Sequence, residues 1–309
     1  MNFFKKLLLL FVVVFSGAAN AVTLQDMQQR YSEFQSLKSS GKNPLPFFLE
    51  SQNSSVSSSA SVRYLLENVS FETFATRLNK PSEWCEFIPL HLNIKACGYL
   101  HLGSAEMLQF HAGVKGYLPP DKAHQLLLRF ESGFENGVYT ASLFAEDGPL
   151  DSSNIDFKIR AIAIEEQGTE SIYLEFDLSS VPGLAASLAK LYLATVARKK
   201  IGFSTIGQSI SGKPRYVKGQ RAATERNIVR YLLAIETYFA TLGVDADDQY
   251  DQRLERWYDA TELYSEQLYE LGRSEYMFNK RRERENQVVL QHALENNIEP
   301  VYIPLDRRR

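Results

Sequence analysis

Residues 61–95 read SVRYLLENVSFETFATRLNKPSEWCEFIPLHLNIK, and the capping and proline signals in this stretch give the strongest indication of the fold. Ser70 is a suitable N-cap for a helix. Pro81 suits the first turn of a second helix, which Pro89 prevents from continuing. The predicted order is therefore strand, helix, helix, strand, over Val62–Val69, Phe71–Leu78, a short helix from Pro81 through Phe87, and His91–Cys97.

Several further strands are predicted downstream, separated by turn signals that contain Gly, Pro or Asn. In Ser171–Leu178, apolar side chains alternate with polar ones, which is typical of an antiparallel sheet with one buried face. The strands expected before the next helices are Met107–Gly116, Gln125–Glu131, Val138–Glu146, Phe157–Glu165 and Ser171–Leu178.

The C-terminal third is predicted to be mainly helical. We expect an Ala-rich helix over Leu184–Ala197, one more strand over Ile201–Ile206 and an amphipathic helix over Thr224–Leu242. Beyond Gly243, apolar residues spaced by three and four from Leu254 to Leu271 predict a long helix with a heptad-like seam. Lys280–Glu285 (KRRERE) is expected to be its solvated continuation.

Residues 1–21 have the layout of a secretory signal peptide. Lys5 and Lys6 precede an apolar run, and small residues end at Ala21. We expect cleavage near Ala21 and a periplasmic or secreted protein that begins near Val22. No later segment approaches 18 uninterrupted apolar residues, so no transmembrane span is expected.

Composition excludes one class of function. The sequence has 34 basic and 37 acidic residues, and loss of Lys5 and Lys6 with the leader would change the net charge from −3 to −5. General nucleic-acid binding requires a basic field, so no nucleic acid is expected as a partner.

The chain length suits one main core with appendages. A short amphipathic helix is expected over residues 24–38, and the Ser-rich stretch SQNSSVSSSAS is interpreted as a flexible linker. The predicted organisation is a signal peptide (1–21), an N-terminal helical segment (22–50), a linker (51–61), an α+β domain (62–242) and a C-terminal helical extension (243–309).

Cys85 and Cys97 are the only cysteines. In an oxidising compartment two such residues form a disulfide, and closing this loop would stabilise the protein by roughly 3 kcal/mol. Reactive thiols or metal ligands are the alternative. There is no C-x-x-C motif, and His91 between the cysteines does not complete a zinc site, so no metal and no cofactor are expected.

The order of elements resembles the helix-grip fold of the START, polyketide-cyclase and Bet v 1 superfamily. The resemblance covers roughly Val62–Leu242, with Trp84 and Pro89 at the positions of a Trp and a Pro in that superfamily. It implies an antiparallel sheet wrapped around a long helix, with extra N- and C-terminal helices here.

The chain also resembles a family of uncharacterised exported proteobacterial proteins. That resemblance implies no catalytic residue. Its matching pieces are Trp84-Cys85, Leu90-His91-Leu92-Asn93 with Lys95 and Cys97, and Gly219-x-Arg221 with Glu225-Arg226-Asn227 and Arg230-Tyr231.

A sheet around a long helix can enclose an apolar cavity, which is a default ligand site. Arg226 and Arg230 lie four residues apart on one helical face and together could hold a carboxylate or phosphate headgroup. Structural ion pairs and a filled core are the alternatives. The candidate ligand-binding residues are Arg226, Arg230, Tyr231, Ile235 and Phe239.

Three hypotheses of function follow. The leading one is an exported protein that binds or carries a hydrophobic, lipid-like molecule without catalysis. The second is an envelope interaction protein whose N-terminal helix and Leu254–Leu271 seam dock a partner or a second copy. The third is a cyclase- or hydrolase-like enzyme with Glu225 as a base, although neighbouring arginines would keep that carboxylate weakly basic.

Overall fold

The computed structural model describes residues 22–41, 43–54, 56–166, 168–183 and 200–305. An antiparallel eight-stranded sheet, in the order β1-β2-β8-β7-β6-β5-β4-β3, forms its centre. The strands are β1 (Phe48–Asn53), β2 (Ser58–Glu67), β3 (Ile94–Leu102), β4 (Ala105–Ala112), β5 (His124–Glu135), β6 (Val138–Asp147), β7 (Ser153–Glu166) and β8 (Thr169–Val181). A separate two-stranded hairpin contains β9 (Ile201–Gln208) and β10 (Pro214–Lys218).

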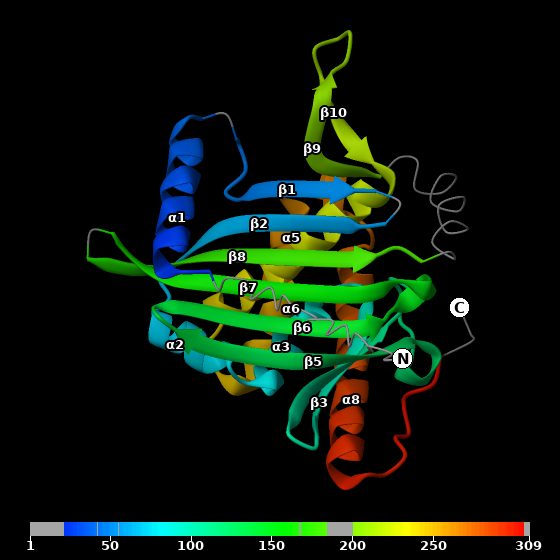
Figure 1. Ribbon diagram of the computed structural model, residues 1–309. Helices are drawn as coiled ribbons and strands as arrows, with labels where there is room; N and C mark the ends of the chain where they lie inside the picture. The colour runs from blue at the N-terminus through cyan, green and yellow to red at the C-terminus, as the bar shows by residue number, and fades with distance from the viewer. Residues whose placement is uncertain (1–21, 42, 55, 167, 184–199, 306–309) are drawn as a thin grey trace, which may run out of the picture.

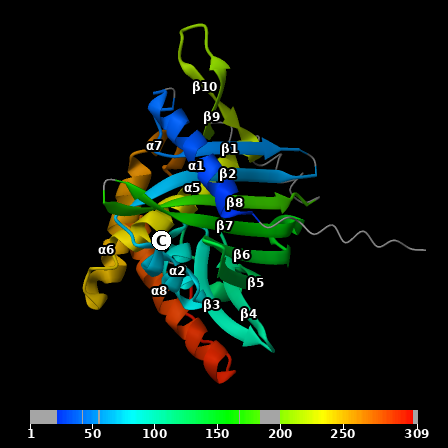
Figure 2. The ribbon, with the colours of Figure 1, turned by 60° about the vertical axis from the view of Figure 1, so that its left-hand side comes forward.

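Helices cover both faces of the sheet. Helix α1 crosses the front face in Figure 1, whereas α5, α6 and α8 lie behind the sheet; Figure 2 shows the same arrangement from the side. The α-helices are α1 (Leu24–Ser39), α2 (Phe71–Leu78), α3 (Pro81–Phe87), α5 (Gly219–Ala240), α6 (Ala246–Glu262), α7 (Ser265–Leu268) and α8 (Arg273–Asn296).

The predicted opening of the domain is confirmed. Ser70 caps α2 by accepting a hydrogen bond from the amide of Thr73, and Pro81 starts α3 without a side-chain cap. The indole of Trp84 then donates to the carbonyl of Leu78 (2.8 Å), which fixes the angle between the two helices. Strand β3 begins at Ile94 rather than His91, because a 3₁₀ turn over Ile88–Leu90 uses more residues for the reversal.

The meander from β3 to β8 follows the predicted strands closely. Its β5–β6 turn has positive φ at Asn136 (52°) and Gly137 (83°), the conformation that a two-residue hairpin loop requires. Strand β2 pairs with β8 along its length, so the strand that precedes the two short helices lies beside the last strand of the meander.

The Ser-rich linker prediction is wrong. Strands β1 and β2 include most of residues 51–61 and pair from Phe48↔Arg63 to Asn53↔Ser58. Small hydroxylated side chains suit this position because one face of the hairpin lies against α5: the Ser58 hydroxyl, for example, contacts that of Thr224 at 2.7 Å. Composition alone suggested flexibility, whereas pairing with β8 gives the segment a strand conformation.

The two faces of the sheet have separate cores. The larger core lies between the sheet and α5 and includes Trp84, Phe176 and Trp257. A smaller core under α1 is built from Met27, Phe34 and Tyr173, among others. The alternation predicted in β8 is therefore confirmed, but the second face is also partly buried because α1 covers it.

The C-terminal helices share the main core. The predicted seam residues Leu254, Trp257 and Leu268 are buried within this chain and belong to its larger hydrophobic cluster. The continuous helix expected there is wrong, since α6 ends at Glu262 and α8 starts after Gly272. This seam is therefore packed against the chain's own domain and is not free to dock a partner.

Of the remaining predicted elements, two are confirmed and one lies outside the described residues. The predicted helix Thr224–Leu242 corresponds to α5, which starts five residues earlier, at Gly219. The predicted strand Ile201–Ile206 corresponds to β9. The predicted helix Leu184–Ala197 lies outside the described residues.

Candidate functional site

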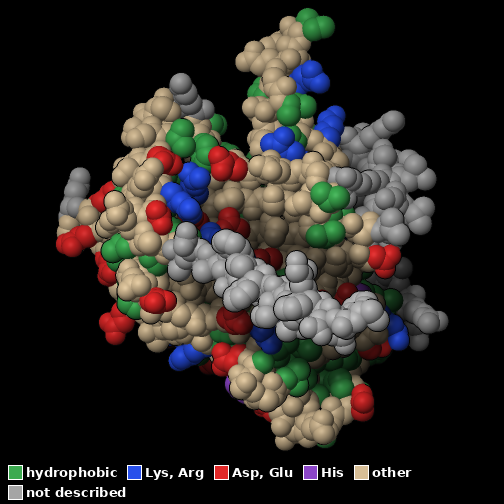
Figure 3. Space-filling view, in the orientation of Figure 1, with side chains coloured by type: hydrophobic (Ala, Val, Ile, Leu, Met, Phe, Trp, Pro, Cys, Tyr) green, Lys and Arg blue, Asp and Glu red, His purple; other side chains and the backbone are tan. Residues whose placement is uncertain are grey.

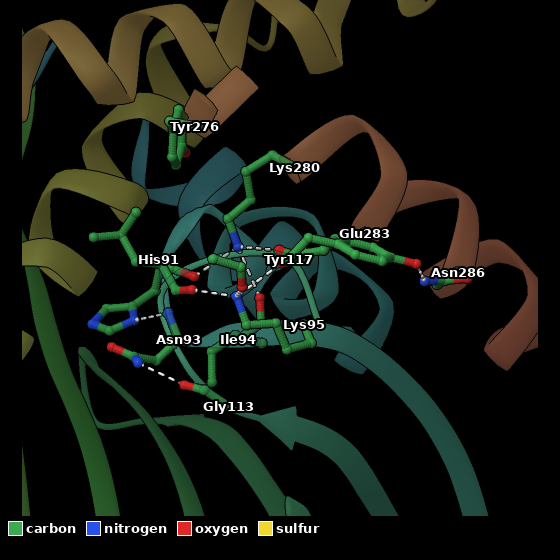
Figure 4. Close-up of polar contacts among 12 residues, drawn as sticks. His91, Asn93, Ile94, Lys95, Gly113, Tyr117, Tyr276, Lys280, Glu283 and Asn286 are labelled. Carbon is green, nitrogen blue, oxygen red and sulfur yellow. Dashed lines mark hydrogen bonds and ion pairs between the residues drawn. The ribbon is translucent and has the colours of Figure 1, made fainter. Parts of the chain in front are cut away.

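Two groups of charges, one fully and one partly buried, lie behind the sheet, and they differ in how fully their hydrogen-bonding capacity is used. The first, which we name the lysine cluster, consists of Lys95 of β3 with Lys280 and Glu283 of α8 (Figure 4). All three side chains are at most 2% exposed. The predicted solvated continuation at Lys280–Glu285 is therefore wrong at these two positions, because one face of α8 packs on β3.

The lysine cluster has no spare donor. The ammonium of Lys95 donates to the carbonyls of Leu92 (2.7 Å) and Gly116 (3.0 Å) and to Glu283 Oε1 (2.8 Å). The ammonium of Lys280 donates to two other carbonyls and to Glu283 Oε2 (2.7 Å). Each ammonium has three N–H groups, so the two lysines together have six, and all six donate hydrogen bonds. This cluster therefore links α8 to β3 and is not a ligand site.

Burial lowers the pKa of Lys280 to about 8, although Glu283 opposes the shift. An unfolded lysine has a pKa of about 10.4, so between these values the unfolded chain binds more protons, and stability rises with pH. We expect wild-type protein to gain stability relative to Lys280→Met between about pH 8 and 10, by at most about 1.4 kcal/mol per pH unit. Urea unfolding of both proteins at each pH measures this, and an unchanged difference would contradict it.

The second group, which we name the basic cluster, contains Arg226 and Arg230 of α5, Lys115, Lys200 and Glu270. Glu270 accepts hydrogen bonds from Lys115 and from Lys200 (2.5 Å), and Arg230 lies 3.3 Å from its other oxygen. Three cationic side chains thus contact one carboxylate, and Arg226 interacts with it electrostatically. Arg226 and Arg230 lie together, as their spacing predicted. The carboxylate in this cluster is the side chain of Glu270, not that of a ligand.

The arginines of the basic cluster are buried but incompletely paired. Arg226 is 7% exposed and Arg230 is 3% exposed. Arg226 donates to the carbonyl of Ile201 (3.2 Å), and Arg230 donates to that of Leu268 (3.0 Å). The Nε–H group of each guanidinium has no partner among the described residues. Unlike the lysine cluster, this site retains donors for another acceptor.

Positive charge outweighs negative charge in the basic cluster, and burial and these charges shift the pKa values of its members. Burial lowers the pKa of Arg230 to about 10, and burial also lowers the pKa of Arg226. Burial alone would raise the pKa of Glu270, but Lys115, Lys200 and Arg230 hold it below its ordinary value. Glu270 is therefore ionised at neutral pH and pairs with three cations, while Arg226 interacts electrostatically with both Glu270 and Glu225.

The neighbouring carboxylate, Glu225, has a different role. It is fully buried and accepts hydrogen bonds from the amides of Phe203 (2.7 Å) and Ser204 (2.9 Å). The hydroxyl of Ser51 also donates to it, and Arg221 lies 3.5 Å away. Its lone pairs are therefore occupied by structural donors, so Glu225 is not available as the general base of the enzyme hypothesis.

The predicted apolar lining is a packed core. Tyr231 stacks on His91 at 4.6 Å between ring centroids and contacts Phe157 edge-on at 5.4 Å. Phe239 stacks on Phe74, and Ile235 is 1% exposed. Side chains that line a lipid-sized cavity would have surface accessible to water, whereas Tyr231, Ile235 and Phe239 are almost completely buried. Ligand entry at this position therefore requires Tyr231 or its neighbours to move.

A polar hollow also lies on the opposite face of the sheet. It has a volume of about 520 Å³, and Figure 3 shows this face. Arg30 of α1 lies 2.7 Å from the buried Glu175 of β8, while Arg160 lies 2.5 Å from Asp177. The Arg30–Glu175 pair joins α1 to the sheet, whereas the Arg160–Asp177 pair joins β7 to β8. The residues predicted for binding are not part of this hollow.

The remaining members of the basic cluster could not be found from the sequence. Lys115 follows β4, Lys200 precedes β9, and Glu270 lies between α7 and α8. Nothing in their local sequence distinguishes them from solvated charges. Only the (i, i+4) spacing of Arg226 and Arg230 carried a signal.

The antiparallel sheet wrapped on α5, opened by a strand and two short helices, is a START-like, helix-grip fold. No family model matches the chain, and no curated protein matches it. Neither comparison supports membership of the exported proteobacterial family. Within the described ranges, no helix combines the length and apolar character needed to cross a membrane.

Solved structures with a similar arrangement include human STARD10, at 13% identity and a TM-score of 0.31, covering 54% of this chain and 76% of that one. A conserved protein of unknown function from Enterococcus faecalis shares 10% identity with a TM-score of 0.32, covering 70% and 91%. A conserved protein from Geobacillus kaustophilus shares 14% identity with a TM-score of 0.30, covering 45% and 84%. At these values the similarity carries no inference about a ligand.

Proposed function

We propose that this protein is exported and binds a hydrophobic small molecule that carries an anionic group, without chemical turnover. The observation behind the proposal is the basic cluster, in which three cations pair with Glu270, Arg226 lies nearby, and two buried Nε–H groups lack partners among the described residues. Charge-assisted hydrogen bonds to a carboxylate or phosphate would use these donors. The leader-like residues 1–21 support export.

The position of the basic cluster also supports an amphiphilic ligand. Lys115 and Lys200 have side chains that are 43% and 31% exposed, so an anion can approach from solvent. Arg230 is adjacent to Tyr231, whose ring lies in the aromatic core. An anionic head on the arginines would therefore place an attached apolar chain beside Tyr231, Phe157 and Phe176.

The first experiment is native mass spectrometry of protein isolated from the periplasm, with extraction of any bound molecule. We expect a chain that begins near Val22 and a co-purifying anionic amphiphile.

Binding of cis-parinaric acid, a fluorescent fatty acid, should weaken at least about tenfold in Arg226→Gln, because a hydrogen bond to a charged group contributes about 1.5–3 kcal/mol. Arg129→Gln, at an exposed position on β5, is the matched control.

Glu270→Gln separates a binding role from a purely structural one. Removing the competing carboxylate should increase the affinity for the fatty acid, and inorganic phosphate should raise the Tm of this variant more than that of wild type. A purely structural cluster predicts lower stability with no gain in anion binding. No co-purifying molecule, together with equal probe binding by Arg226→Gln and wild type, would overturn the proposal.

A further inference from the structure

The β9–β10 hairpin projects from the edge of the molecule. In Figures 1 and 2 it extends beyond β1, and the space-filling view shows a hydrophobic side chain at its tip with Lys and Arg side chains along it (Figure 3). Ile210 at the turn is fully exposed, and Ile206 of β9 is 54% exposed. The hairpin therefore presents apolar side chains to solvent at the point furthest from the core.

The base of the hairpin is firmly attached to the body. Phe203 and Val217 are buried, and the carboxylate of Glu225 accepts hydrogen bonds from two β9 amides. Gly202 permits this approach, because a Cβ atom there would lie 2.4 Å from Glu225 Oε2. The exposed tip is thus held in a fixed position by α5.

The turn has its own hydrogen bonds. The amide of Ser209 donates to the carbonyl of Lys213 (2.8 Å), and that of Gly212 donates to Ser209 (2.9 Å). Gly212 has a φ of 77°, which glycine adopts without strain. The exposure of Ile210 therefore belongs to an ordered turn.

The charge of the hairpin is opposite to that of the whole protein. Residues 200–224 contain five basic residues and no Asp or Glu, whereas the full chain has a net charge of −3. Lys213, Arg215 and Lys218 are exposed, and in the described part of the chain none of them forms an ion pair. Their charge is available to an external anionic surface.

We propose that the β9–β10 hairpin docks this protein on an anionic lipid surface, with Ile210 inserting at the headgroup level. Basic residues beside exposed apolar side chains match the two attractions that hold peripheral proteins on such membranes. A single apolar tip offers little area to a protein partner, whereas it suits shallow insertion. This inference goes beyond ligand binding and does not depend on it.

Vesicle sedimentation tests the docking. Wild-type protein should bind vesicles of phosphatidylcholine and phosphatidylglycerol in equal parts, should bind phosphatidylcholine alone much less, and should dissociate as salt is added. Each basic residue near an anionic surface contributes about 1 kcal/mol, so Lys213→Glu with Arg215→Glu should weaken binding by about thirtyfold or more. Ile210→Ser should weaken it severalfold.

The control variants make the same kinds of substitution, a double charge reversal and the loss of one exposed apolar side chain, at positions outside the hairpin. Lys80→Glu with Arg129→Glu reverses two exposed charges away from the hairpin, and Leu263→Ser removes an exposed leucine. Both should bind nearly as wild type does. In Ile210→Trp, tryptophan emission should shift to shorter wavelength on the anionic vesicles, because Trp84 and Trp257 are buried and the new residue alone changes environment.

Three results would overturn the membrane inference. These are equal binding of both vesicle types, equal loss of binding in the hairpin and control double variants, and an Ile210→Trp emission that vesicles do not change. Crosslinking of the hairpin to a periplasmic protein without vesicle binding would assign it to a protein partner instead. All these measurements use vesicles without added fatty acid, so they do not depend on whether the basic cluster binds a ligand.

Discussion

Glu283→Gln is expected to lower the free energy of unfolding by about 3–5 kcal/mol, the effect of removing one partner from a buried ion pair. Glu283 is 2% exposed and contacts the ammonium groups of Lys95 (2.8 Å) and Lys280 (2.7 Å). In the variant, two buried positive charges lose their only shared carboxylate. Urea-induced unfolding of the purified protein, followed by circular dichroism, measures the change.

Glu285→Gln is the matched control, because Glu285 is on the same helix but exposed. It should change stability by no more than about 0.5 kcal/mol. Lys95→Met combined with Glu283→Leu should recover part of the stability, since this double variant removes one buried positive charge together with the carboxylate. A loss below about 1 kcal/mol in Glu283→Gln would contradict the buried network.

Replacing both Cys85 and Cys97 with alanine is expected to cost about 2–4 kcal/mol. The predicted disulfide is confirmed, with a Cα–Cα distance of 5.1 Å across 12 residues of sequence. It joins α3 to β3, and both sulfur atoms belong to residues that are at most 4% exposed. Without the bond, the unfolded chain gains conformational freedom while the native packing changes little.

Reduction provides an independent measure of the same bond. Dithiothreitol should destabilise wild-type protein by a similar amount and leave the double alanine variant unchanged. Thiol titration of denatured protein, prepared without reductant, should detect no free thiol. Two titratable thiols per chain would show that the bond is absent from the purified protein.

Local signals predicted the elements well where periodicity and capping agreed. Ser70 and Pro81 indicated the starts of α2 and α3, and alternation in Ser171–Leu178 indicated β8. Composition was misleading at the Ser-rich stretch 51–61, because the backbone pairing of a sheet outweighs the low strand propensity of serine. Ser58, Ser59 and Ser61 of β2 are paired with both β1 and β8.

The C-terminal region shows why charge patterns are weak evidence of exposure. KRRERE has the composition of a solvated helix, yet Lys280 and Glu283 are buried. Their burial depends on Lys95 and on carbonyls that lie nearly 190 residues earlier. No local feature distinguishes these two charges from exposed Glu285.

Local sequence patterns were sufficient to predict the strand–helix–helix–strand opening, the pairing of the two cysteines and the amphipathic character of α5, but not strand β1. These depend on capping, periodicity and residue type, all of which act over a few neighbouring positions. Which charges are buried together, and which remain unpaired, follows only from the packing of distant segments. The lysine cluster, the basic cluster and the exposed hairpin all arise from contacts between distant segments, and burial is a property of the packed chain rather than of any residue in it.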